Sequence, residues 1–417
     1  MIKNLLTILF LFLTVPCFGA TQQVLVFGTA DANNTTTTEY MPLAPLNNVA
    51  WTSDETNMKT VWPASGTINN LRVELDTNPG AGNSFTHTIR VNGATPASPT
   101  QAVCTNTTNC SDTTNATTIT AGDEVSFESI PTSGPSTGDV QWSVIWNPTT
   151  ADETVLVGGT VGNALATAGT EYLTAHAISV PQAASWDAST LVPTGGTFKS
   201  LYVELGTAPG AGTSRTFAFG TVDCTISETA TTCNSAADTQ AATAGQAYTL
   251  TSTVSGTPAA STVRYGIVFV PTTSGQFIFN YASSDNTPSA STEYNNIAAG
   301  VELIWTATQT DRAVLANDFT MKNMYFEVEA DLGPDTDTLT ATFNIDASNT
   351  LMTCAVSGTG AGPWQCSDTR DIAVSDDERL YIQIVPAGPP NTSDSRFAFT
   401  GFLTPTGGAD RRIIMVN

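Results

Sequence analysis

Hydrophobic and polar residues alternate with a period of two in several stretches of this chain. In the first of them, Phe85, His87, Ile89 and Val91 occupy every second position. The alternation returns further along, at Phe217 and Phe219 and then at Leu339, Ala341, Phe343 and Ile345. This period is typical of a β-strand with one buried face. No stretch shows the period of an amphipathic helix, so the pattern predicts an all-β protein.

One predicted strand, together with the turn that ends it, occurs three times. The clearest copy covers residues 196–212, an earlier copy covers 66–82, and a weaker copy covers 319–333. Each copy is rich in β-branched and aromatic residues. The first two copies end at Pro-Gly, whereas the third has Leu332 in the place of Pro79. The chain is therefore built from three similar segments.

Other landmarks recur in the same order around these strands. The tripeptide Thr-Glu-Tyr occurs at 38–40, 170–172 and 292–294, and a tryptophan follows each copy: Trp51, Trp186 and Trp305. In the repeated strand, Glu74, Glu204 and Glu327 lie 130 and then 123 positions apart, which is the size of a domain and not of a short solenoid repeat. The sequence predicts a signal peptide at 1–20 and three domains at 21–150, 151–273 and 274–417.

Each predicted domain contains about eight short strands, with turn residues every 8–12 positions. This pattern indicates an antiparallel sandwich, and the domain length fits a jelly roll better than an immunoglobulin-type domain of about 100 residues. The expected fold class is therefore all-β, with three tandem antiparallel β-sandwich (jelly-roll-like) domains.

The order of the motifs resembles tandem jelly-roll-like modules of uncharacterised phage-related and bacterial surface proteins. The motifs are Gly-Thr with Leu-x-Val, then Pro-Gly-x-Gly, Asn-Gly, Ala-Gly-Asp and a late aromatic strand. They cover most of the chain after residue 20, but they are turn and core residues. The resemblance implies a fold and a structural or binding role, and it carries over no catalytic residue.

The first residues have the pattern of a secretory signal. Lys3 precedes an apolar run from Leu5 to Val15, and the small residues Gly19 and Ala20 follow. The apolar run is too short for a membrane span. We expect cleavage near Ala20 and a soluble protein that is secreted or held at the cell surface.

Cysteine usage agrees with export. Cys17 lies in the signal, and the other six cysteines fall two in each predicted domain. Such pairs in a secreted chain predict disulfides. The expected pairs are Cys104 with Cys110, Cys224 with Cys233, and Cys354 with Cys366. A metal or redox site is disfavoured, because no histidine lies nearby and no spacing is Cys-x-x-Cys.

The charge balance limits the choice of partners. The formal net charge is −23, although only 12% of the residues are charged. An acidic surface of this kind repels nucleic acids and anionic membranes. We expect no nucleic-acid partner and no membrane span.

Repeated carboxylates are the first candidates for chemistry. They form two sets, Glu39, Glu171 and Glu293, and Glu74, Glu204 and Glu327. A glycosidase needs two carboxylates about 5–10 Å apart, but a chain seldom carries three catalytic copies. His87 and His176 do not recur, and His87 alternates with apolar residues as a packed strand residue would. No nucleophile elbow, phosphate loop or zinc-binding histidine pair is present. We therefore expect that the protein is not an enzyme.

Acidic loops and unrepeated tryptophans are the remaining candidates. Asp331, Asp335 and Asp337, like 376–378, offer the oxygens that calcium prefers, but without the spacing of a known calcium loop. A solvated turn is the favoured interpretation, and no cofactor is predicted. Trp62 and Trp364 are the candidates for stacking on a sugar, because the three recurring tryptophans are expected to fill the ends of the sandwiches.

The sequence leaves more than one function possible. The favoured function is a secreted, non-enzymatic structural or surface-display protein of an extracellular or virion-like assembly; the alternatives are a carbohydrate-binding or adhesin module array and a glycan-active enzyme.

The sequence contains four similar short strands but only three domains. The strands cover 24–28, 155–158, 277–280 and 412–416. Either one terminal copy is surplus and can pair with another chain, or adjacent domains share the copy between them.

Overall fold

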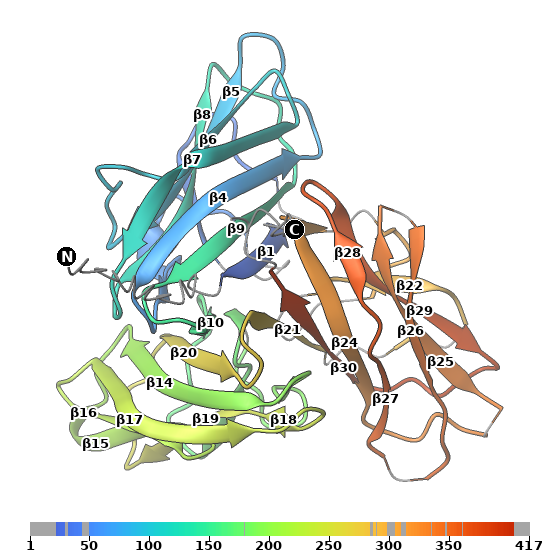
Figure 1. Ribbon diagram of the computed structural model, residues 1–417. Coiled ribbons are helices and arrows are strands. Elements are labelled where there is room, and N and C mark those ends of the chain that lie inside the picture. Colours follow the sequence, from blue (N-terminus) through green and yellow to red (C-terminus); the bar gives the residue numbers. More distant parts are fainter. Residues whose placement is uncertain are drawn as a thin grey trace, which may run out of the picture.

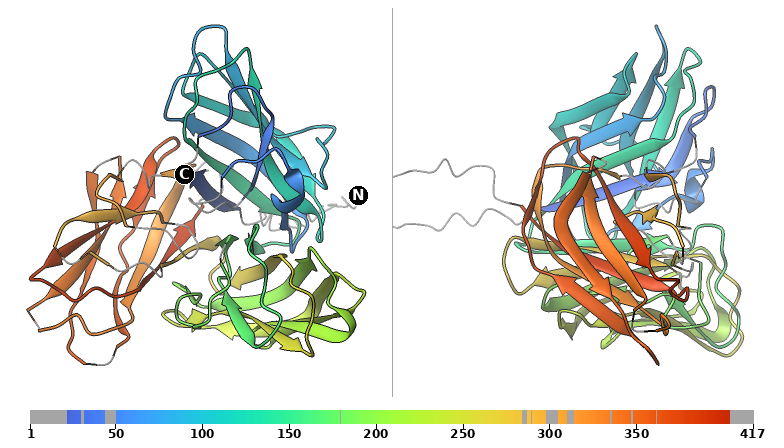
Figure 2. Two further views of the ribbon diagram at one scale, coloured as in Figure 1. Left: turned by 180° about the vertical axis from the view of Figure 1, so that it is seen from behind. Right: turned by 90° about the vertical axis from the view of Figure 1, so that its right-hand side faces the viewer.

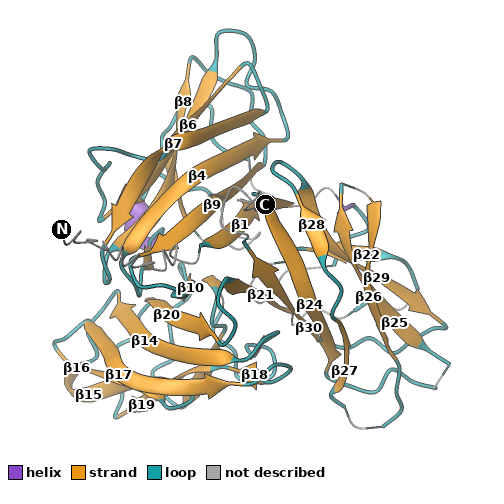
Figure 3. Ribbon diagram, in the orientation of Figure 1, coloured by secondary structure: helices purple, strands orange, loops and turns teal. Residues whose placement is uncertain are grey.

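The chain folds almost wholly into β-strands (Figure 3). The computed structural model describes residues 22–29, 32–43, 50–178, 180–283, 287–288, 290–297, 305–309, 314–334, 336–346, 348–360 and 362–403. Within these ranges one short 3-10 helix, Glu55–Asn57, accompanies thirty strands. No helix in them is long and apolar enough to cross a membrane. The predicted all-β class is confirmed, while the predicted signal at 1–20 and strand at 412–416 lie outside the described residues.

The first group of strands, which we call the first repeat, forms two facing sheets. One sheet has the order β1-β9-β4-β7 and the other the order β2-β8-β5-β6, with the short β3 paired to β8. The strands are β1 (Gln23–Thr29), β2 (Glu39–Pro42), β3 (Thr60–Val61), β4 (Gly66–Leu75), β5 (Ser84–Val91), β6 (Gln101–Thr105), β7 (Asn109–Ile119), β8 (Glu124–Thr132) and β9 (Val140–Pro148). Side chains from both sheets form one hydrophobic cluster between them.

The second repeat has main sheets in the orders β12-β10-β20-β14-β17 and β11-β19-β15-β16, and β13 pairs with β18. The parallel pairing of β10 with β12 is the exception to an antiparallel pattern among the described strands. The strands are β10 (Thr154–Gly159), β11 (Thr170–Leu173), β12 (Ala177–Ile178), β13 (Thr190–Leu191), β14 (Gly196–Leu205), β15 (Gly210–Phe219), β16 (Val222–Glu228), β17 (Thr232–Ala242), β18 (Ala247–Tyr248), β19 (Leu250–Ser255) and β20 (Val263–Pro271).

The third repeat returns to the pattern of the first. Its sheets have the orders β21-β30-β24-β27 and β22-β29-β25-β26, with β28 paired to β24 and β23 paired to β29. The strands are β21 (Gln276–Ser283), β22 (Glu293–Asn295), β23 (Val314–Leu315), β24 (Phe319–Val328), β25 (Thr338–Ile345), β26 (Ser348–Val356), β27 (Trp364–Asp368), β28 (Ile372–Val374), β29 (Arg379–Ala387) and β30 (Ser395–Phe402).

The strand that occurs three times in the sequence, β4, β14 and β24, lies inside the first sheet of each repeat. Each copy has one residue with positive φ at the same point: Asn70 at 52°, Ser200 at 53° and Asn323 at 48°. The pairing register shifts at this residue in all three strands. A bulge of this kind bends and twists a strand, so the three sequence copies share one local geometry.

The short strands β1, β10 and β21 each open a repeat. They pair antiparallel with β9, β20 and β30, the last strands of their own repeats. The copy at 24–28 is therefore not surplus, and adjacent repeats do not share these strands. The fourth copy, at 412–416, lies outside the described residues.

The three predicted disulfides are confirmed. Cys104 bonds Cys110, Cys224 bonds Cys233, and Cys354 bonds Cys366. In each case the bond joins a strand of one sheet to a strand of the facing sheet, β6 to β7, β16 to β17 and β26 to β27. Each disulfide therefore ties the two sheets of its repeat together at the rim.

The three repeats surround a common centre (Figures 1 and 2), and their contacts close into a ring. Val24, Val155 and Ile278 occupy the same position of β1, β10 and β21, opposite Ile145, Val268 and Thr400. Val24 is buried in the hydrophobic cluster of the third repeat, Val155 in that of the first, and Ile278 in that of the second. The first repeat thus contacts the second, the second contacts the third, and the third contacts the first.

A small residue permits the close approach at each contact. Ser143, Gly266 and Ala398 are equivalent, because they pair with Arg72, Tyr202 and Tyr325 of the repeated strand. A Cβ atom on Gly266 would lie 2.5 Å from the Val61 oxygen and 2.7 Å from Pro63 Cδ. The backbone of the first repeat therefore packs directly against the glycine of the second.

Replacing this glycine should separate the first two repeats. We expect Gly266→Ala to lower the free energy of unfolding by about 1–3 kcal/mol, as overpacking does, and to lengthen the distance between these repeats in solution scattering. Gly195→Ala is the matched control, because a Cβ there meets no atom closer than 3.4 Å. Equal behaviour of the two variants would contradict the proposed contact.

Acid should destabilise the first repeat through His87. The ring is fully buried, it stacks on Phe127 with centroids 5.5 Å apart, and neither nitrogen has a hydrogen-bond partner. The predicted packed strand histidine is confirmed. Burial lowers the pKa of His87 from 6.5 to about 3. Because the folded-state pKa lies below the ordinary value, stability present above pH 6.5 is lost as the pH falls towards 3.

We expect His87→Leu to remove this loss, which amounts to roughly 1.4 kcal/mol for each pH unit between the two pKa values. Urea unfolding at neutral pH and near pH 4 measures it. His176, whose pKa burial lowers to about 4, stays in both proteins and contributes equally. The prediction fails if wild type and variant lose the same stability on acidification.

Candidate functional site

The carboxylates of the repeated strand lie at the three contacts between repeats. Glu204 Oε1 lies 3.5 Å from Arg264 Nη1, Glu327 Oε1 lies 2.6 Å from Arg396 Nη2, and Glu74 pairs with Arg379. Every arginine of these pairs takes part in a contact between repeats: Arg379 through Glu74 itself, and Arg264 and Arg396 through further partners.

Glu74 pairs across two repeats, whereas Glu204 and Glu327 each pair with an arginine of their own repeat. Arg379 belongs to the third repeat and Glu74 to the first. Arg264 also pairs with Glu124 of the first repeat. Burial raises the pKa of Glu204, and the charge of Lys59, again from the first repeat, opposes this rise. The recurrence of this carboxylate therefore coincides with a repeated packing position at the contacts between repeats.

The second set of repeated glutamates holds the loops that precede them. Glu39 accepts a hydrogen bond from the backbone N–H of Asn34 at 2.8 Å, and Glu171 accepts one from Ala166 at 2.7 Å. Glu293 accepts a hydrogen bond from the Ser291 hydroxyl at 3.3 Å. The Thr-Glu-Tyr motif thus marks the end of a loop that its own carboxylate fixes.

The structure corrects the prediction for Trp62. Its side chain is fully buried and packs edge-on against Trp146, with ring centroids 5.4 Å apart. An indole without exposed surface has no face to offer a sugar. Trp364 is half-buried, and it packs against the hydrophobic cluster of the third repeat.

The recurring tryptophans do not share one role. Trp51 and Trp305 are buried in the clusters of their own repeats, as expected for the ends of the sandwiches. Trp186 differs, because its ring lies over the Arg396 guanidinium of the third repeat, with 3.5 Å between the charged carbon and the ring centroid. A cation above an aromatic face is an attractive contact. Trp186 thus links the second repeat to the third.

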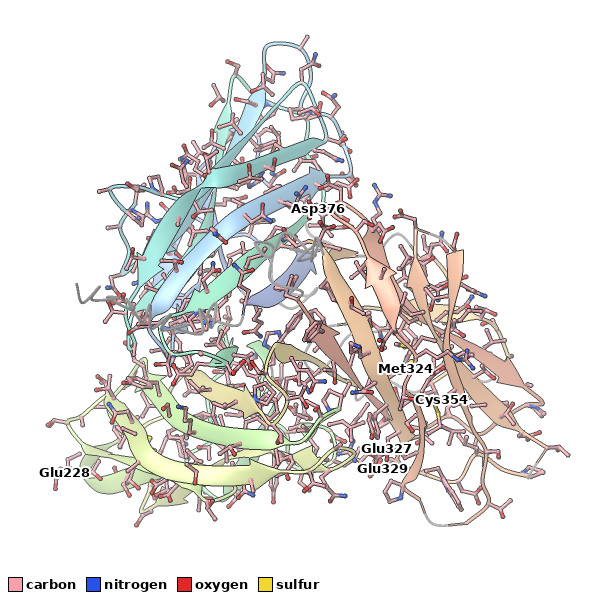
Figure 4. All side chains as sticks on the ribbon, viewed as in Figure 1. Glu228, Met324, Glu327, Glu329, Cys354 and Asp376 are labelled. Carbon is pink, nitrogen blue, oxygen red and sulfur yellow. A yellow bond between two sulfur atoms is a disulfide. The ribbon has the colours of Figure 1, made fainter. Side chains whose placement is uncertain are left out.

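An open pocket of about 580 Å³ lies beside this stacked pair. Trp186 of the second repeat forms part of its wall, and the rest comes from the third repeat. The lining residues are Trp186, Glu329, Ala330, Asp331, Gly360, Gly362 and Pro363. Figure 4 shows Glu329 near Glu327, at the place where β24 ends against the second repeat. This pocket is the candidate functional site.

One lining residue, Glu329, belongs to a group of three carboxylates. Those of Asp187, Glu329 and Asp394 each offer an oxygen, and these oxygens lie within 4.8 Å of one another. Burial raises the pKa of Glu329, the charge of Asp187 raises it further, and Arg396 opposes the rise. In the described part of the chain this is the one group of three or more side chains close enough to share a metal ion. Hard cations such as calcium prefer oxygen ligands of this kind.

The acidic residues singled out in the sequence do not all lie at the pocket. Asp331 lines the pocket, and hydrogen bonds from the backbone of Gly360 and Gly333 lower the pKa of its carboxyl. Asp337 is buried and does not line it, and Asp335 lies outside the described residues. Asp187 and Asp394 were missed, because no local spacing reveals carboxylates that different repeats bring together.

Comparison with protein-family models and with curated proteins finds no match for this chain.

Proposed function

We propose that the chain consists of three jelly-roll domains and serves as a secreted, non-enzymatic structural or surface-display unit of an extracellular or virion-like assembly. The strand order supports the domain type. With the short β3 set aside, one sheet of the first repeat holds its first, eighth, third and sixth strands, and the other holds its second, seventh, fourth and fifth. Eight-stranded, two-sheet jelly rolls occur in viral capsids and in lectins.

The observation that carries this proposal is the closure of three similar repeats into a ring within one chain. Closed cyclic arrangements are the usual way in which proteins build symmetric assemblies. Here a single chain supplies all three positions, so a threefold-like unit forms without association of separate chains. Such a unit is suited to repeated use as a building block.

The disulfides support an extracellular setting. Three disulfides, one in each repeat, require an oxidising environment to form and persist. The acidic balance, with a formal net charge of −23, favours solubility outside the cell. Signal cleavage near Ala20 belongs to the same proposal.

Localisation tests the proposal directly. We expect antibodies against the chain to label the exterior of intact source cells or particles in many copies, as immunogold electron microscopy would show. Mass spectrometry of the recovered protein should find the first 20 or so residues removed, as for a secretory signal, and the six remaining cysteines oxidised. Recovery of the chain from the cell interior with free thiols would contradict the proposal.

Glycan binding is the second candidate function, and the pocket is the observation that favours it. A half-buried indole beside carboxylates offers an aromatic surface and hydrogen-bond acceptors together. Aromatic stacking and a few placed polar groups are the usual means of holding a sugar in a pocket. The pocket also lies between two repeats, where ligand sites often occur.

A glycan array tests this candidate. If wild type binds a glycan, we expect Trp186→Ala and Glu329→Gln to abolish binding, because both side chains line the pocket. Glu228→Gln is the matched control, since Glu228 lies at the far tip of the second repeat (Figure 4). Trp364→Ala tests the other predicted contact. Absence of binding by wild type, or full binding by both pocket variants, would remove the candidate.

A further inference from the structure

The three contacts between repeats can be compared position by position. The backbone N–H groups of Gly122, Gly245 and Asp377 donate to the carbonyls of Trp62, Val192 and Ala316 respectively. All three donors have positive φ, 93°, 77° and 65°. They therefore occupy equivalent positions in one loop, which lies at the contact with the neighbouring repeat. On the other side of the contact the equivalent residues are Arg72, Tyr202 and Tyr325.

Two of the contacts use a glycine against a tyrosine. A Cβ on Gly122 would lie 3.5 Å from the Tyr202 ring, and one on Gly245 would lie 3.2 Å from the Tyr325 ring. These are the contacts of the first repeat with the second and of the second with the third. Neither side carries a formal charge at this position.

The contact that closes the ring uses charges at the same place. Asp377 pairs with Arg72, with Oδ1 and Nη1 2.9 Å apart, and Asp376 also pairs with Arg72. Figure 4 shows Asp376 where the third repeat meets the first. Arg72 Nε donates to Asn317 Oδ1 at 3.2 Å. A glycine and a tyrosine are thus replaced by an acid and a base.

In a second ion pair of this contact the charges are reversed, with the base on the third repeat and the acid on the first. Arg379 Nε of the third repeat donates to Glu74 Oε2 of the first at 3.0 Å. The equivalent of Arg379 in the first repeat is Glu124, because each pairs with the short strand before the repeated strand. Glu124 faces Arg264 of the second repeat. If the third repeat docked on the second repeat's strand instead, Arg379 would face Arg264, and Asp377 would face Tyr202 without a partner.

Chain connectivity explains why this contact alone needs charges that select the correct partner repeat. β9 ends at Pro148 and β10 begins at Thr154, while β20 ends at Pro271 and β21 begins at Gln276. These short connections hold consecutive repeats together. The third and first repeats have no direct connection, and the residues that join them lie 305 positions apart. Complementary charges give specificity more than they give affinity.

We propose that Arg72 and Glu74 form a charge-coded docking surface on the first repeat, and that this surface selects the third repeat through Asp376, Asp377 and Arg379 and so closes the ring. We call these five residues the latch. The inference rests on contacts within the chain, so it holds whether or not the protein belongs to an assembly.

Charge exchange in the full-length chain tests the latch. Spin labels at the exposed positions Thr113 and Thr359, introduced through an unnatural amino acid so that the disulfides stay intact, report the distance between the first and third repeats. We expect Glu74→Arg and Arg379→Glu each to lower the ratio of closed to open rings by on the order of tenfold, because two like charges then face each other across the contact. The double variant, with the two charges exchanged, should restore the wild-type distance.

Two controls separate opening from misfolding. Lys322→Glu breaks an ion pair with Asp371 that lies elsewhere in the third repeat, and it should leave the distance unchanged. A second label pair, on the first and second repeats, should not respond to any latch variant. Closed rings in both single variants, or no recovery in the double variant, would overturn the proposal.

Salt gives an independent readout. Screening at about 1 M salt should shift wild type towards open rings. The triple variant Arg72→Tyr, Asp376→Ala and Asp377→Gly keeps only the Glu74–Arg379 pair of the latch, so its distance should change less with salt than that of wild type. The same salt response in wild type and in this variant would also overturn the proposal.

Discussion

The arrangement of the three repeats depends on apolar side chains that each repeat places in the core of another. Val24, Val155 and Ile278 lie on the opening strands, yet their side chains belong to the hydrophobic clusters of neighbouring repeats. Burial of such a side chain contributes about 1.5–3 kcal/mol. No repeat has a complete core by itself, so the three repeats form one body and do not behave as separate beads on a string.

The same strands explain how the centre of the ring avoids exposed sheet edges. β1 and β21 lie at the ends of their sheets, where unpaired backbone groups are a hazard for aggregation. Both strands lie near the centre of the molecule (Figure 1), with β1 against β23 and β21 against β13 of a neighbouring repeat. Closure therefore covers these two edges as well as the apolar side chains, whereas the second repeat pairs β10 with its own β12.

The sequence predicted what depends on neighbouring residues and missed what depends on contacts between repeats. Alternation located β5 and β25, and cysteine spacing gave all three disulfides, because both signals lie within a few residues. Trp62 was wrongly predicted to lie at the surface. Val192 and Ala316 occupy the equivalent buried position in the other repeats, so Trp62 is a larger side chain at a shared core position. Trp186 was grouped with Trp51 by order alone, and nothing near it in the sequence reveals that it stacks on Arg396.

The candidate site shows the same limit. Asp331 was singled out from its acidic loop, and it does line the pocket. The two acids grouped with the lining residue Glu329 could not be found, because Asp187 and Asp394 come together only when the second and third repeats touch. The recurrence of Glu74, Glu204 and Glu327 was visible, but its cause was not. A repeated residue in a tandem array can mark a shared packing position as readily as a shared chemical role.

The pairing of each opening strand with the last strand of its repeat has a consequence for the order of folding during synthesis. β1 begins at Gln23, and its partner β9 ends only at Pro148. The first sheet therefore stays open until more than a hundred further residues have been made, and long-range pairing of this kind is slow. The side chain of Val24 is buried later still, because it packs into the hydrophobic cluster of the third repeat, which is the last to be synthesised. The N-terminal strand is thus among the first parts of this protein to be made and among the last to be covered, and an apolar strand left uncovered in this interval is prone to aggregation.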